Sequence, residues 1–149
     1  IGVQSLLTEN KNTFQELIRE LKKGNLVAMK VEEAKQPLAS YFRHILFRND
    51  CYEIIVIVWE RNSKSPIHDH AHRGCCMLLC EGTLTETKYI LNDEKTEVKE
   101  ILSVNTLHGG DDATYIDNTM GVHSIENTGL IPAISLHIYS PPRHQAQLF

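Results

Sequence analysis

The chain has 149 residues, a mass of 17.0 kDa and a formal net charge of −4, with 15 Lys and Arg against 19 Asp and Glu. This length fits one domain, and the mild acidity argues against nucleic acid or an anionic membrane as the main partner. No apolar run approaches the roughly 18 residues of a membrane span, and the first residues lack a basic and then apolar leader. We therefore expect a cytoplasmic protein with reduced thiols and no membrane contact. No sequence feature marks an association face, so we also expect a monomer.

The first forty residues predict a small helical cap. Residues 13–23 carry apolar side chains at the i, i+3, i+4, i+7 spacing of an amphipathic helix. Thr13, followed three residues later by Glu16, matches a capping box at its start. A second helix is predicted over about 27–36 and ends before Pro37.

From about residue 40 the sequence changes to short β-branched and aromatic runs separated by turn signals. The predicted strands cover 51–59, two segments of 74–91 on either side of Gly82, 97–104, 113–117, 121–127 and 133–140. Short strands with frequent Gly, Asn and Asp turns are typical of an all-β sandwich or barrel. We predict one domain over 1–149, with the helical cap at about 1–40 and a β-barrel at about 41–149.

Three histidines are candidate metal ligands. His68 and His70 flank Asp69, and residues i and i+2 of a strand point to the same face. His123 lies on a later predicted strand, from which the barrel could bring a third imidazole to the pair. An HxH pair alone is a weak signal, but three imidazoles together suit Fe, Zn, Cu or Ni.

The spacing around these histidines resembles the two motifs of the cupins. The first motif runs from the HxH pair to Gly82, and the second runs from Gly121 through His123 to Asn127. Cys75 stands where many cupins carry an acidic residue, so this site offers three neutral histidines and no carboxylate ligand. Among cupins that combination is similar to the thiol dioxygenases.

Four further segments resemble the cysteine dioxygenase family. They are Trp59, Tyr41-Phe42-Arg43, residues 115–127, and Ser135-Leu136-His137-Ile138-Tyr139-Ser140-Pro141-Pro142. The last one matches the family motif SLHLYSPP almost letter for letter. The resemblance covers about residues 41–142. It implies a cupin (jelly-roll) barrel that oxidises L-cysteine with O2 to cysteine sulfinic acid, the first step of cysteine catabolism. It also suggests a cis peptide bond between Ser140 and Pro141.

The resemblance implies a metal and a substrate clamp. It makes His68, His70 and His123 the ligands of one Fe(II) per chain, with no organic cofactor. Three neutral ligands would leave the site at +2, which favours binding of an anionic thiolate. Arg43 would hold the substrate carboxylate with its planar fork, assisted by Tyr41 from the same wall.

The resemblance also implies a relay and a crosslink. Ser135, His137 and Tyr139 alternate and therefore share one strand face. In the family they form a hydrogen-bonded relay that places the Tyr139 hydroxyl near iron and substrate. The family also joins this tyrosine to the cysteine of the first motif by a thioether, here Tyr139 and Cys75. Trp59 would line or back the pocket, or pack in the core.

The sequence offers two candidates for the cysteine that faces into the barrel. Counted from the HxH pair, plain alternation aims Cys76 inward, whereas the spacing of the family motif favours Cys75. A bulge at Gly74 could shift the register by one residue. Cys75 is the preferred candidate, and Cys76 is its rival.

Three other functions compete with cysteine oxidation. A dioxygenase acting on 3-mercaptopropionate is the nearest, and the presence of both Arg43 and Cys75 favours cysteine over it. Arg143 counts against this preference, because in the rival group an Arg in that region could also bind a carboxylate. An aminothiol dioxygenase would have no use for Arg43. A non-enzymatic metal- or sugar-binding cupin would leave the Ser-His-Tyr relay unexplained.

Overall fold

The computed structural model describes residues 41–149 apart from residue 111. This part of the chain contains eight strands and no helix. The strands are β1 (Tyr41–Arg48), β2 (Glu53–Trp59), β3 (Cys75–Glu81), β4 (Thr83–Leu91), β5 (Val98–His108), β6 (Ala113–Ile116), β7 (Val122–Asn127) and β8 (Ala133–Tyr139). The helical cap predicted over about 1–40 lies outside the described residues, and the single-domain prediction over 1–149 stays a prediction.

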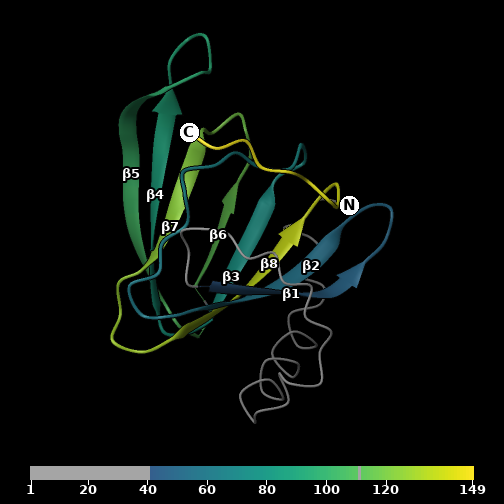
Figure 1. Ribbon diagram of the computed structural model, residues 1–149, viewed down its shortest axis with the longest axis vertical. Coiled ribbons are helices and arrows are strands. Elements are labelled where there is room, and N and C mark those ends of the chain that lie inside the picture. The colour runs from purple at the N-terminus through teal and green to yellow at the C-terminus, as the bar shows by residue number, and fades with distance from the viewer. Residues whose placement is uncertain (1–40, 111) are drawn as a thin grey trace.

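The strands form two antiparallel sheets (Figure 1). One has the order β1-β2-β8-β3-β6 and the other has the order β5-β4-β7. A buried cluster joins the two sheets, because it combines residues of β2, β3 and β8 with Leu84 of β4, Leu107 of β5 and Ile125 of β7. The predicted all-β architecture is therefore confirmed. No helix long and apolar enough to cross a membrane occurs among the residues described.

The three central strands of the larger sheet are buried on both faces. Alternate residues of β2, β3 and β8 enter the cluster between the sheets, and the intervening residues form a second cluster on the opposite face. Burial of both faces explains why these strands read as continuous apolar runs rather than as alternating patterns. It also explains why the sequence locates them well, within about two residues at their ends.

Strand β1 was not predicted from the sequence. It pairs with β2 through the register Tyr41↔Trp59 to Arg48↔Glu53, but the register shifts between Ile45 and Phe47. A β-bulge of this kind interrupts the period of two, so an amphipathic pattern cannot be followed along the segment. Its two arginines and one histidine weaken the apolar signal further.

The segment that carries the HxH pair is fixed between β7 and the end of the chain. His68 and His123 exchange both backbone hydrogen bonds, at N–O distances of 3.0 and 3.1 Å. On the other side, Asp69 N donates to Gln147 O, and Phe149 N donates to Ile67 O. These bonds extend the smaller sheet beyond β7 and bring His68 directly opposite His123.

Candidate metal centre

The three predicted ligands come together at one place. One nitrogen from each of His68, His70 and His123 lies within 4.8 Å of the other two. The expectation of an HxH pair within a strand was wrong, since both histidines lie in the connection between β2 and β3. They converge because His68 pairs with β7 and because Asn118 exchanges two hydrogen bonds with the backbone of His70, at 2.9 and 3.0 Å.

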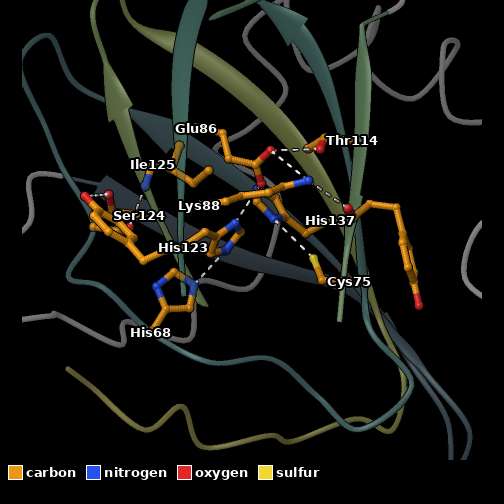
Figure 2. Close-up of polar contacts among 12 residues, drawn as sticks. His68, Cys75, Glu86, Lys88, Thr114, His123, Ser124, Ile125 and His137 are labelled. Carbon is orange, nitrogen blue, oxygen red and sulfur yellow. Dashed lines mark hydrogen bonds and ion pairs between the residues drawn. The ribbon is translucent and has the colours of Figure 1, made fainter. Parts of the chain in front are cut away.

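Hydrogen bonds fix the ring nitrogen that His68 and His123 direct inward. The Nδ1–H of His68 donates to the carbonyl of Pro66 at 2.8 Å, and that of His123 donates to a carboxylate oxygen of Glu86 at 2.7 Å. In the neutral rings each Nε2 then carries a lone pair. The two Nε2 atoms face each other at 3.1 Å, an arrangement that a cation would stabilise (Figure 2).

His70 supplies the clearest sign that a metal fits. Its side chain is 2% exposed, and neither of its ring nitrogens has a hydrogen-bond partner among the described residues. Burial lowers the pKa of His70 to about 2, helped by the neighbouring rings of His123 and His68, so the imidazole is neutral. Buried polar atoms are nearly always satisfied, and a metal ion would accept the lone pair of this ring.

Glu86 is a residue of this site that the sequence reasoning missed. It lies on β4, fully buried, and its second carboxylate oxygen accepts a hydrogen bond from Thr114 Oγ1 at 2.8 Å. Lys88 Nζ lies 3.8 Å from that same oxygen. Figure 2 shows Lys88 beside Glu86. Burial raises the pKa of Glu86, while Thr114 and Lys88 oppose the rise. Leu84 and Glu86 share the inward face of β4. A charged residue at an inward position of a strand is the sequence signal that could have identified Glu86 as part of the site.

The predicted relay is connected in a single direction. The indole N–H of Trp59 donates to Ser135 Oγ at 2.8 Å, so the Ser135 hydroxyl can use its own hydrogen to donate to His137 Nε2 at 2.7 Å. The proton of a neutral His137 is then on Nδ1, 3.3 Å from the Tyr139 hydroxyl. Burial holds the pKa of His137 well below its usual range, which agrees with a neutral ring. Trp59 therefore contacts the relay directly, in addition to lining the cavity.

Cys75, and not Cys76, faces the site. Cys75 lies opposite Tyr139 in the β3–β8 register, and its Sγ is 3.9 Å from His137 Nδ1. Cys76 belongs to the apolar cluster on the other face of the sheet. The residue before them, Gly74, has a φ of +93°, and a Cβ there would lie 2.7 Å from Tyr115 Oη. A turn at Gly74 therefore resets the alternation, in place of the suggested bulge.

The cavity in front of the histidines has a volume of about 320 Å³. Its walls include the predicted substrate residues Tyr41, Arg43 and Trp59, and the Tyr41 and Trp59 rings lie 4.6 Å apart. No side chain among the described residues forms a hydrogen bond or ion pair with Arg43. A small cavity lined by His68 and His123, and by a guanidinium that has no partner among the described residues, suits a small anionic ligand.

The end of the chain closes one side of this cavity. Residues 144–146 and Leu148 line it, and His144 Nε2 lies 2.9 Å from a carboxylate oxygen of Asp69. Arg143 does not line this cavity. It lies instead on a second cavity of about 150 Å³, which shares Arg43, Glu53 and His144 with the first. The Ser140–Pro141 peptide bond is cis, as the family resemblance suggested.

Comparisons with known proteins point to one family. The family described as "Cysteine dioxygenase type I" matches residues 13–149. The chain is 36% identical to cysteine dioxygenase type 1 of Rattus norvegicus over 95 residues, which are 63% of this chain and 47% of that protein. It is 30% identical to the Danio rerio protein of the same name over 102 residues, 68% of this chain and 51% of that protein. The chain thus spans about half the length of these relatives.

Solved structures establish the fold. The polyketide cyclase RemF from Streptomyces resistomycificus superposes with a TM-score of 0.61 at 16% identity, over 82% of this chain and 80% of that chain. An RmlC-like cupin from Shewanella frigidimarina gives a TM-score of 0.60 at 14% identity, over 80% and 89% of the two chains. At such identities the likeness concerns the fold alone, and it confirms the predicted cupin barrel.

Proposed function

Because the chain belongs to the cysteine dioxygenase type I family, we propose that it oxidises L-cysteine with O2 to cysteine sulfinic acid. The observation that carries the proposal is the convergence of three histidines, one of which has no hydrogen-bond partner for its ring among the described residues. Two of them, His68 and His123, line one small cavity together with Arg43 and the relay. The reaction would be the first step of cysteine catabolism, in the cytoplasm, by a monomeric protein. The single cupin domain would cover 1–149.

The three histidines would hold one Fe(II), and no organic cofactor is needed. The bound iron supplies the redox chemistry by which both atoms of O2 are added to the thiolate sulfur. Neutral imidazoles leave the ion's own charge uncancelled, although the carboxylate of Glu86 behind His123 offsets part of it. A positive centre favours the thiolate over the thiol of the substrate.

Arg43 and Tyr41 would bind the substrate carboxylate. We expect Arg43→Ala to raise the KM for L-cysteine by about 10- to 100-fold with a smaller change in kcat, because a charge-assisted bidentate contact is lost. The measurement is steady-state O2 uptake by the iron-loaded protein. Cysteamine, which lacks the carboxylate, should keep its KM in the variant. Unchanged kinetics with cysteine would remove Arg43 from the substrate site.

The relay would orient the hydroxyl of Tyr139 toward the substrate. His137 Nδ1–H donates toward the Tyr139 oxygen, so the hydrogen of this hydroxyl can be donated to the neighbouring Cys75 sulfur or to a substrate in the cavity. Burial raises the pKa of Tyr139 well above its usual value, so the phenol keeps its proton near neutral pH. Tyr139 would therefore act as a hydrogen-bond donor to the reacting groups.

Cys75 and Tyr139 would form the thioether crosslink. They are cross-strand neighbours, and both lie within 4 Å of His137 Nδ1. A bond from Sγ to the phenol ring releases two hydrogen atoms, which O2 can accept. We expect iron-loaded, aerated protein to run as two bands on a denaturing gel and Tyr139→Phe to run as one. Identical patterns for the two proteins would argue against the crosslink.

Product analysis with a panel of small thiols tests the function. The iron-loaded protein would be given L-cysteine, 3-mercaptopropionate and cysteamine in turn, with O2 uptake and sulfinate formation measured together. We expect cysteine sulfinic acid to form with a stoichiometry of one O2 per thiol. Preference for 3-mercaptopropionate would favour the rival dioxygenase. The absence of sulfinate from every thiol would favour the non-enzymatic cupin.

A further inference from the structure

Glu53 places a buried carboxylate beside the cavity. It is the first residue of β2, is 4% exposed and lies opposite Tyr139 in the β2–β8 register. It lines the main cavity together with Arg43, and both residues also line the second cavity. A free carboxylate here would repel the carboxylate of a substrate and would compete for Arg43.

Arg48 neutralises this carboxylate. Its Nε and one terminal nitrogen both lie 2.7 Å from the same oxygen of Glu53, and the other oxygen accepts a hydrogen bond from Arg143 N at 3.2 Å. Arg48 reaches Glu53 because of the bulge between Ile45 and Phe47. Without that shift, residues five apart on a strand would face opposite sides of the sheet, and Arg48 would point away from the side of Arg43.

We propose that Arg48, by pairing with Glu53, leaves Arg43 free for a substrate carboxylate and so makes the pocket selective for thiols that carry one. The inference rests on the proposed function, in which Arg43 is the carboxylate clamp. Arg48 is a positioning and specificity-determining residue, since it acts on the substrate through Glu53 and Arg43. Arg48 lines the second cavity and not the main cavity, which is lined by His68 and His123.

Four variants isolate this effect: Arg48→Met, Arg48→Lys, Glu53→Gln and the double variant Arg48→Met/Glu53→Gln. L-Cysteine and cysteamine are the matched probes, because they differ only in the carboxylate. Binding is followed without O2 through the fluorescence of Trp59, the only tryptophan in the sequence and a wall of the cavity. The iron-loaded protein is used throughout, and sulfinate formation in air is measured in parallel.

We expect Arg48→Met to weaken L-cysteine binding by about tenfold and to leave cysteamine binding unchanged or tighter, as one uncompensated charge near a half-buried site would do. Arg48→Lys keeps the positive charge but loses the planar, two-nitrogen geometry of the guanidinium. Its affinity for cysteine should therefore lie between those of the wild type and Arg48→Met. In the double variant a neutral amide replaces the carboxylate, so cysteine binding should return to within about threefold of that of Glu53→Gln.

The double variant keeps the inference testable even where Arg48→Met alone fails to fold around an unpaired carboxylate. If it binds cysteine tenfold more weakly than Glu53→Gln does, Arg48 contacts the anion itself and the inference is wrong. Equal weakening of cysteine and cysteamine would also overturn it. A wild-type protein that binds cysteine but forms no sulfinate would refute the proposed function, while the binding ratios would still decide the role of Arg48.

Discussion

Replacing His123 by alanine should leave the protein unable to retain stoichiometric iron. The substitution removes one of three nitrogens that lie within 4.8 Å of one another, and it removes the only partner that faces His68 Nε2 among the described residues. It also leaves the Glu86 carboxylate buried without its imidazole donor. Two histidines alone hold a divalent ion weakly, so we expect less than about one tenth of an equivalent after gel filtration.

The matched control for this experiment is His72→Ala. His72 continues the spacing of the HxH pair but is exposed, so it should load iron like the wild type. Metal content is measured after anaerobic loading, and the fluorescence of Trp59 reports whether each variant is folded. Full iron retention by a folded His123→Ala protein would exclude His123 from the ligand set and would require a different third donor.

Much of the barrel could be predicted because its strands leave recognisable apolar runs in the local sequence. The strands β2, β3 and β8 are buried on both faces, and their continuous apolar runs locate them without knowledge of their neighbours. The three histidines could be predicted for a different reason. Their spacing within two motifs resembles that of a known family. The resemblance identified a third candidate ligand, His123, more than 50 residues away from the HxH pair.

The choice between Cys75 and Cys76 shows where counting along the chain fails. Alternation holds only while the backbone stays extended, and the turn at Gly74 ends it. The positive φ of this glycine and its close approach to the Tyr115 ring are visible only in the structure and not in the sequence. The motif spacing gave the better answer because it already includes the effect of the turn.

The contacts that the charged residues of the site make could not be predicted, since each depends on pairing between distant strands. Glu86 meets His123 only because β4 lies beside β7, and Thr114 reaches Glu86 from β6. Arg48 meets Glu53 only because a bulge turns it to the side of Arg43. Sequence alone showed residue types that suit a metal and a carboxylate, but not the groups that hold those residues in place.

Glu86→Gln should weaken iron binding by about 10- to 100-fold, the usual loss when the partner behind a metal-bound histidine is changed. Glutamine can still accept the Nδ1–H of His123, so the ring orientation should survive. The negative charge that raises the electron density of the imidazole is lost, and Lys88 then lies 3.8 Å from a neutral amide. Glu86→Ala removes both charge and acceptor, and its effect should be larger.

Affinity is measured by competition with a chelator, first for Co(II) under air and then for Fe(II) without O2, so the result does not depend on turnover. Glu100→Gln is the matched control, because the same chemical change at an exposed carboxylate of β5 should alter nothing. A Glu86→Gln protein with wild-type affinity would mean that Glu86 supports packing alone. A graded loss from Glu86→Gln to Glu86→Ala would instead separate charge from orientation, because only the first variant retains an acceptor for His123.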